Sequence, residues 1–263
     1  YTIISRMVKK IVFAGNNQIA VDILKFLTRQ KVNIVGLVVH PANLAKKRQK
    51  LISLSQLPKS KIFRGDRLNN VQTLTTIKNL KPDLFLSINF RYLLKDEIIK
   101  TLKFGCINLH FGYLPYNRGV FADAWSIIEN TPAGVTYHLI DTGIDTGKII
   151  SQMEVDKTDI DTGKTLYQKL TVAAYDLFVK TWPKIQNWSF RPIDQSPGGT
   201  YHRRSDIALI EKIDLGKKYK AGDLINILRA RTFPPYHGAY FINPGGTKIH
   251  LRLKLYKPRT LIV

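Results

Sequence analysis

The stretch CINLHFGYLPYNRG, residues 106–119, carries the side chains best suited to chemistry. Asn108 and His110 lie two positions apart at the end of an apolar run, and in a strand such residues point to the same face. An amide N–H can stabilise negative charge on a carbonyl oxygen, and an imidazole can move a proton near neutral pH. The pair predicts chemistry at a carbonyl group. From N-x-H alone, however, a structural role in bonding loop backbone ranks first.

A repeated tetrapeptide contains aspartates that could act together with His110. IDTG occurs at 140–143, 144–147 and 160–163. The third copy opens a helical pattern, where its Asp or Thr is an N-cap candidate. In the first two copies, Asp141 and Asp145 lie between expected strands and can face a cleft. A carboxylate that reaches His110 would favour the imidazolium and orient the ring, but spacing does not choose between the two aspartates, and turn chemistry explains both.

Other motifs for cofactors and metals are weak. The sequence has no phosphate-binding P-loop and a single cysteine, Cys106, so we expect no zinc site, no internal disulfide and a reducing, cytoplasmic compartment. The turn FAGNN has too few glycines for a dinucleotide site. Asn16 could assist a phosphate at the following helix N-terminus, although capping is its commoner role. His138 is expected to be a structural histidine within an apolar strand.

Strand and helix patterns alternate around these residues. Strands are expected within 8–17, where the strand runs into a turn, and at 32–40, 61–63, 83–88, 105–110, 133–140 and 148–155, and helices at 18–30, 69–80, 95–102 and 165–185. This alternation predicts an α/β fold with a mainly parallel, Rossmann-like sheet and helices on both faces. We assign residues 7–190 to this domain.

A second, smaller domain is expected after a segment rich in Pro, Gly and Ser at 191–204. A helix around 221–232 and a β-hairpin joined through 243–248 predict a small α+β domain over 200–263. The six residues before Met7 receive no functional role.

The net charge of +22 is the most prominent global property. Such a charge attracts nucleotides, nucleic acids or anionic lipids without choosing among them, and a solvated basic surface is an equally good explanation. No apolar run approaches the roughly 20 residues that a membrane span requires, so membrane insertion is not expected.

Residues 107–152 resemble the catalytic core of the folate-dependent formyltransferases. The resemblance rests on N-x-H at a strand end, a loop LPYNRG that departs slightly from the family's L-P-x-Y-R-G, the sequence GVT, and a loop that ends in D-x-G. It implies the formyltransferase fold and a catalytic trio of Asn108, His110 and Asp145. It selects Asp145 over Asp141 because DTGKII follows Asp145.

The resemblance also implies a mechanism and a formyl donor. N10-formyltetrahydrofolate would supply the formyl group to an amine, Asn108 and protonated His110 would stabilise the oxyanion, and Asp145 would orient His110, with no metal. The pterin would bind beside Phe90, Arg91, Tyr92 and Leu93 and the loop that contains Asp141.

The acceptor expected from the resemblance is a nucleotide-linked amino sugar, with methionyl-tRNA as the alternative. Fewer than seventy residues follow residue 200, which is shorter than the C-terminal domain of the tRNA enzymes. The similarity is greatest to enzymes that act on a dTDP-4-amino-4,6-dideoxyhexose for surface polysaccharide (O-antigen) synthesis. We expect Asn16, Arg118, Arg203 and Arg204 to contact this substrate, nucleic acid not to be a partner, and a homodimer to form. A noncatalytic polyanion-binding protein with the same fold is the alternative from another class.

Overall fold

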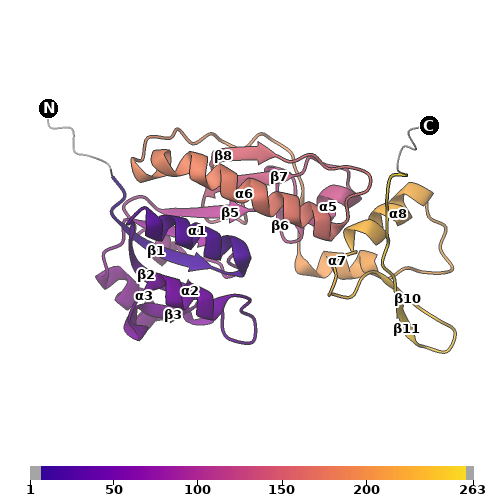
Figure 1. Ribbon diagram of the computed structural model, residues 1–263, viewed down its shortest axis with the longest axis horizontal. Helices are drawn as coiled ribbons and strands as arrows, with labels where there is room; N and C mark the ends of the chain where they lie inside the picture. Colours follow the sequence, from indigo (N-terminus) through magenta and orange to yellow (C-terminus); the bar gives the residue numbers. More distant parts are fainter. Residues whose placement is uncertain (1–6, 259–263) are drawn as a thin grey trace. The chain divides into compact units, whose positions relative to one another are not determined.

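A seven-stranded sheet forms the centre of the computed structural model, which describes residues 7–258. Its strand order is β3-β2-β1-β4-β5-β7-β8 (Figure 1). The strands are β1 (Lys10–Gly15), β2 (Asn33–Val39), β3 (Ile62–Arg64), β4 (Leu84–Ile88), β5 (Cys106–His110), β7 (Gly134–Leu139) and β8 (Ile149–Glu154). The pairs β1–β2, β1–β4, β2–β3 and β4–β5 are parallel, and β5–β7 is antiparallel. The predicted mainly parallel sheet is therefore confirmed.

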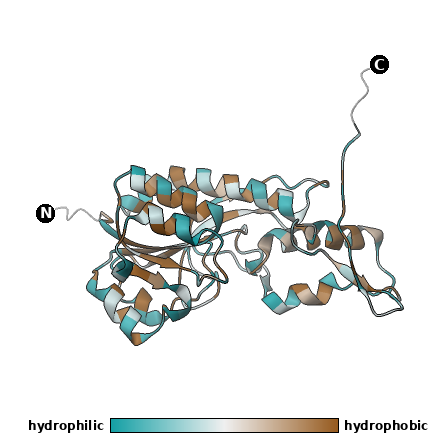
Figure 2. Cartoon of the chain, turned by 60° about the horizontal axis from the view of Figure 1, so that its bottom comes forward, coloured by the Kyte–Doolittle hydropathy of each residue, from teal (hydrophilic) through white to brown (hydrophobic). Residues whose placement is uncertain are grey.

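Helices cover both faces of this sheet, as predicted. They are α1 (Asn17–Arg29), α2 (Arg48–Ser55), α3 (Val71–Asn79), α4 (Asp96–Ile99) and α6 (Gly163–Gln186). Cys106 on β5 belongs to the same buried cluster as Ile77 of α3 and Ile98 of α4. Tyr137 lies opposite Leu109 in the β5–β7 ladder, on the other face, and its hydroxyl donates to the carbonyl of Ala174 in α6. Figure 2 shows apolar residues along the strands and the helix sides that cover them.

The short elements not expected from the sequence include α2, α5 (Ala122–Ile128), β6 (Arg118–Gly119) and β9 (Tyr201–His202). The strands β6 and β9 have two residues each, too few for an alternating pattern. Helix α2 buries only Leu51 and has no clear apolar face. Elements this short depend on tertiary contacts, which sequence periodicity does not report.

The chain divides into two compact units. The first unit comprises the residues up to His110, Thr136–Met153 and Ala174–Ser196, and the second comprises Phe111–Val135, Glu154–Ala173 and the residues from Pro197 onward. The chain thus passes between the units several times. This grouping therefore differs from the predicted division into two consecutive domains near residue 200. The domain assignment 7–190 and 200–263 stays a prediction, and residues 1–6, to which we gave no role, lie outside the described part.

The second unit has the α+β character predicted for the C-terminal part. It contains α5, α7 (Arg204–Glu211), α8 (Ala221–Ala230) and an antiparallel hairpin of β10 (Tyr240–Ile242) and β11 (Lys248–His250).

Thr162 caps the start of α6, because its hydroxyl accepts the Thr165 N–H at 3.3 Å. Within residues 7–258, no helix combines the length and apolar character needed to cross a bilayer.

Candidate active site

Strand β5 presents Asn108 and His110 at its carboxyl end, on one face of the first unit's sheet. Cross-strand pairing with β7 places His138 directly opposite Asn108, and Thr136 opposite His110. His110 and His138 are both buried, with 6% and 2% of their surface exposed. The antiparallel register therefore adds a second imidazole to the predicted pair.

Asp145 contacts all three of these side chains. Its Oδ2 lies 3.4 Å from His110 Nδ1, and its Oδ1 lies 3.4 Å from His138 Nε2 and 3.4 Å from Asn108 Nδ2. Only 14% of the Asp145 side chain is exposed. The structure thus brings the three residues of the predicted trio together around one carboxylate, which can orient His110 and stabilise its charged form.

A chain of hydrogen bonds sets the orientation of the Asn108 amide. His138 Nδ1 lies 2.8 Å from the Leu139 carbonyl oxygen, which can only accept, so Nδ1 carries a proton. In the neutral form of the ring, Nε2 then accepts the N–H of Asn108 Nδ2 at 3.1 Å. Asn108 Oδ1 accepts the Ser87 hydroxyl at 2.8 Å. These bonds turn the donor end of the amide toward Asp145 and away from Ser87.

Asp141 and Asp145 have different surroundings in the same loop. Asp141 is exposed, and its Oδ1 accepts the Gly143 N–H at 3.0 Å and the Thr146 hydroxyl at 2.6 Å. The carboxylate of Asp141 therefore stabilises the turn, whereas that of Asp145 points to the histidines. Spacing left open which aspartate lies near His110, and in this loop it is the Asp145 carboxylate.

The loop after β4 holds the residues predicted to bind the donor. Phe90 and Tyr92 are half-buried, with ring centroids 5.4 Å apart, whereas Arg91 and Leu93 are exposed. Their neighbour His40 was not predicted as part of a site: its ring centroid lies 5.2 Å from that of Phe90 and 5.3 Å from that of Tyr92. The Arg91 N–H points to His40 Nε2 at 3.4 Å. Burial, and then the charge of Arg91, lower the pKa of His40 to about 4.

Asn16 has a different role from the capping considered for it. The residue is buried and makes no side-chain cap to α1. Its Oδ1 accepts the backbone N–H of Lys46 at 2.9 Å, which ties the lysine-containing loop after β2 to the carboxyl end of β1. Asn16 therefore lies at the ligand-binding edge expected for an open α/β sheet, with its side-chain oxygen bonded to backbone.

The three predicted arginines lie together in the second unit. Strands β6 and β9 pair in parallel with Arg118 opposite Tyr201, and Arg203 and Arg204 follow the end of β9 at the start of α7. The Arg204 guanidinium lies 5.2 Å from the ring centroid of Phe121. Phe121 has a backbone φ of +60°, which is uncommon for a bulky residue and is found mainly at functional or tightly constrained sites.

Residues 9–182 match the formyl transferase family model, and residues 206–257 match the N-formyltransferase dimerization C-terminal domain. The chain belongs to the formyl transferase family. This formyltransferase is 30% identical over 173 residues to the dTDP-4-amino-4,6-dideoxyglucose formyltransferase of Mycobacterium tuberculosis, which covers 66% of this chain and 73% of that protein. It is 28% identical over 246 residues to the methionyl-tRNA formyltransferase of Malacoplasma penetrans, covering 92% of this chain and 76% of that protein.

Solved structures of formyltransferases resemble this chain over most of its length. A 4-N formyltransferase from Francisella tularensis has a TM-score of 0.80 and 30% identity, covering 95% of this chain and 99% of that one. WlaRD, a sugar 3N-formyl transferase solved in the presence of dTDP and 5-N-formyl-THF, has a TM-score of 0.69 and 29% identity, covering 88% and 82%. The predicted fold and family are therefore confirmed, and the chain is an N-formyltransferase.

Sequence reasoning missed the contacts of His138 and Ser87 with Asn108. The only signal was the alternation in AGVTYHLI, which placed His138 on a defined face of a strand without identifying the residue across from it. Burial raises the pKa of the Cys106 thiol well above its usual range, which disfavours the reactive thiolate. Among residues 7–258, no cluster of three or more His, Cys, Asp and Glu side chains has an arrangement suited to a metal ion.

Proposed function

We propose that this formyltransferase transfers a formyl group from N10-formyltetrahydrofolate to the amine of a nucleotide-linked amino sugar. The sugar nucleotide we propose is a dTDP-4-amino-4,6-dideoxyhexose destined for surface polysaccharide such as O-antigen. The observation that carries this proposal is the convergence of His110 and Asn108 on the largely buried carboxylate of Asp145.

The three side chains have complementary roles in this reaction. The bound folate supplies the formyl carbonyl that the amine attacks. Asn108 Nδ2 donates one N–H to His138 and directs the other toward Asp145 over a long distance of 3.4 Å. This second, weakly bonded N–H can turn to a developing oxyanion. Asp145 stabilises a proton on His110 Nδ1, so that the imidazolium adds positive charge at the same place.

The described residues fit a pterin beside β4. Phe90, which follows the end of β4, and Ile140, which lies beside Cys106 at the start of β5, pack against the same buried cluster of the first unit. A Cβ at Gly65 would come within 2.5 Å of the Tyr92 ring and 2.9 Å of the Phe90 ring, which leaves glycine as the residue that allows this aromatic loop. We propose that Phe90, Arg91, Tyr92, Leu93 and Asp141 form the donor site, largely through backbone groups.

The arginines of the second unit support a diphosphate-bearing acceptor. Arginine binds diphosphate through paired, charge-assisted hydrogen bonds, and β6–β9 pairing gathers Arg118, Arg203 and Arg204. An aromatic ring under Arg204 can hold the guanidinium in place. We propose these arginines, together with Asn16, as substrate contacts.

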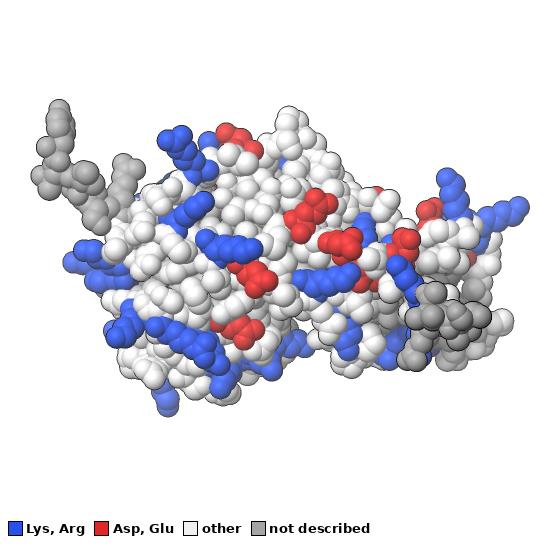
Figure 3. All heavy atoms as spheres, turned by 45° about the horizontal axis from the view of Figure 1, so that its top comes forward, with Lys and Arg blue, Asp and Glu red and all other residues white. Residues whose placement is uncertain are grey.

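Transfer RNA is the second candidate acceptor, and the similarity to methionyl-tRNA formyltransferase over 92% of the chain favours it. The C-terminal match to the N-formyltransferase dimerization domain favours the sugar nucleotide. Figure 3 shows lysines and arginines on one face, with acidic residues among them, and such charge attracts either acceptor without choosing between them.

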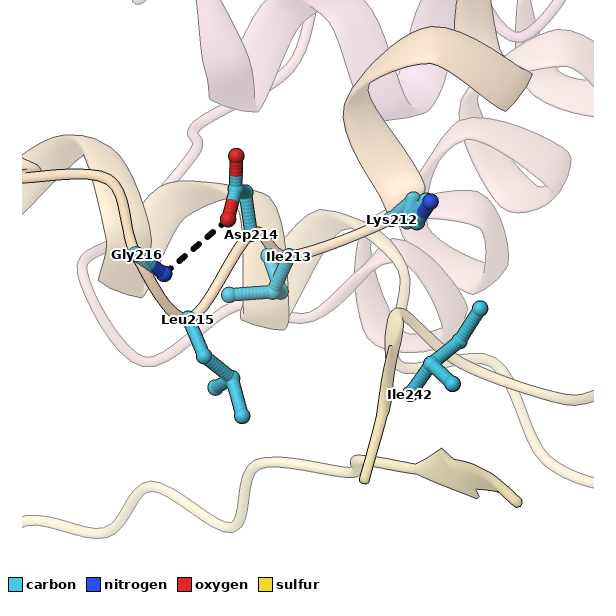
Figure 4. Close-up of a pocket in the computed structure, with 6 residues that line it drawn as sticks. All are labelled: Lys212, Ile213, Asp214, Leu215, Gly216 and Ile242. Atoms are coloured by element: carbon cyan, nitrogen blue, oxygen red, sulfur yellow. Dashed lines mark hydrogen bonds between the residues drawn. The ribbon is translucent and has the colours of Figure 1, made fainter. Parts of the chain in front are cut away.

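We also propose a homodimer formed through the C-terminal domain. The matched segment 206–257 contains a hollow of about 370 Å³, lined by Lys212, Ile213, Asp214, Leu215, Gly216 and Ile242 (Figure 4). Leu215 and Ile242 are 63% and 43% exposed, and Asp214 bonds the Gly216 N–H, so its carboxylate serves the turn. The exposed apolar side chains of Leu215 and Ile242 suit a contact with a second copy. Light scattering of the Leu215→Asp variant should give a monomer mass if this surface is the interface.

The proposed reaction is tested by mass spectrometry. The enzyme is incubated with N10-formyltetrahydrofolate and, in separate reactions, with a dTDP-4-amino-4,6-dideoxyhexose and with charged methionyl-tRNA. We expect a mass gain of one formyl group on the sugar nucleotide, lost in the His110→Ala variant. Formylation of the tRNA alone would replace the proposed acceptor, and no turnover combined with salt-sensitive binding to many nucleic acids would favour a noncatalytic polyanion-binding protein.

A further inference from the structure

The segment 193–195 lies within the predicted linker but is bonded to the first unit. Ile193 and Ile149 exchange two backbone hydrogen bonds, of 2.8 and 2.9 Å, at the start of the edge strand β8. Asp194 adds an exposed ion pair with Lys148, at 3.2 Å. This short antiparallel pairing brings the next residue, Gln195, to the end of the Asp145 loop.

Gln195 bridges two carbonyl groups of that loop. Its Nε2 donates to the Asp145 carbonyl at 2.7 Å and to the Gly147 carbonyl at 2.9 Å. A side-chain amide nitrogen has two hydrogens, so one half-buried group satisfies both acceptors. A backbone N–H would have to share its one hydrogen between the two carbonyls.

The Asp145 backbone needs such support. Asp145 has a φ of +53°, a conformation that residues with a Cβ adopt at a cost, and one that persists where surrounding structure holds it. A bond to its own carbonyl holds the peptide plane that follows the residue, and with it the direction of the side chain. The carboxylate must meet His110 and Asn108 at the same time, so a small rotation would break both contacts.

We infer that Gln195 is a positioning residue for formyl transfer, which acts by holding the Asp145 loop in the conformation that directs the carboxylate to His110 and Asn108. The catalytic part of this inference, an effect on formyl transfer, rests on the proposed function. The structural part, that Gln195 holds the loop, is independent of the substrate.

The first test compares Gln195→Ala with Asp194→Ala. The adjacent Asp194 makes only an exposed ion pair, of the kind that contributes little to stability, so its replacement controls for changes in the segment itself. We expect Gln195→Ala to lower kcat by about 10- to 100-fold with little change in KM, because misplacement of a catalytic group by about 1 Å has effects of this size. We expect Asp194→Ala to match the wild type. A kcat within threefold of wild type for Gln195→Ala would overturn the inference.

A second variant separates hydrogen bonding from packing. Gln195→Glu preserves the shape of the side chain but has no donor when ionised, and its carboxylate faces two carbonyl oxygens. Protonation of the introduced carboxylate restores one O–H donor. We therefore expect the ratio of variant activity to wild-type activity to rise as the pH falls from about 8 toward about 5. A ratio that is constant across this range would contradict the role of the donor.

Amide hydrogen exchange provides a readout that needs no substrate. Residues 140–147 should exchange faster in Gln195→Ala than in the wild type, while β5 remains protected. If the wild-type enzyme formylates no sugar nucleotide, the proposed function fails, and the exchange data still decide whether Gln195 holds the loop. Unchanged exchange in this loop would overturn the inference even in an active enzyme.

Discussion

His138 lies directly across the β5–β7 ladder from Asn108, with its Nε2 3.1 Å from the Asn108 amide nitrogen. The contact explains why an apolar strand carries a buried histidine at this position. The ring receives one amide hydrogen and thereby sets which end of Asn108 faces Asp145. Asn108 thus has its donor orientation fixed before any substrate binds, a form of preorganisation that electrostatic catalysis requires.

Replacement of Asn108 by Leu should lower kcat by about 10²- to 10³-fold, because one oxyanion donor is lost. His138→Leu should have a smaller effect, about tenfold, because the donor remains but its orientation is no longer fixed. In the double variant the losses should not add, since His138 acts through Asn108. Steady-state kinetics of the two single variants and the double variant would measure this coupling, and fully additive losses would show that His138 acts independently.

Gly147→Ala should both destabilise the protein and abolish most activity. A Cβ at this position would collide with the Leu139 carbonyl oxygen, so the base of the Asp145 loop would have to move. We expect the free energy of unfolding to fall by about 1–3 kcal/mol, as for other overpacked sites. Gly222→Ala is the matched control, because a Cβ there meets nothing within 4 Å, and in α8 alanine should stabilise by roughly 0.5–1 kcal/mol. Urea denaturation of both variants would test this contrast.

Acid should destabilise the first unit through His40. The pKa of His40 is lowered from 6.5 to about 4 in the folded protein, so the unfolded chain binds the proton first as the pH falls. Stability is therefore lost progressively between about pH 6.5 and pH 4, by up to about 3 kcal/mol at roughly 1.4 kcal/mol per pKa unit.

His40→Gln should remove this contribution, because its amide does not titrate and can still accept the Arg91 N–H. The measurement is the difference in unfolding free energy between variant and wild type at pH 7.5, 5.5 and 4.5. A difference that is independent of pH would show that His40 does not control this acid sensitivity.

Charge reversal of Arg203 and Arg204 to Glu should raise the KM for the sugar nucleotide by at least tenfold, because charge-assisted bonds to diphosphate would be lost. The KM for the folate and the melting temperature should change little. Lys218→Glu is the control, because it makes the same kind of charge change at an exposed residue of the same unit. Equal KM values for the sugar nucleotide in all variants would remove Arg203 and Arg204 from the substrate site.

The local pattern determined much of this fold and part of the candidate site. Alternation along β5 placed Asn108 and His110 on one face, because side chains in a strand repeat every two residues. Alternating strand and helix patterns likewise predicted the parallel sheet and its helices. Such features depend on neighbours within a few positions, which the sequence displays directly.

The tertiary structure decided which distant residues meet. Two features of the loop distinguish Asp145 from Asp141: Asp145 has a left-handed backbone, and the carboxylate of Asp141 accepts hydrogen bonds within a turn. The spacing of the two residues in the sequence encodes neither feature. His138 reaches Asn108 only through the antiparallel register, and Gln195 reaches the Asp145 loop only because Ile193 pairs with Ile149. These contacts join residues tens of positions apart, and their geometry is set by long-range pairing and packing, which no local periodicity specifies.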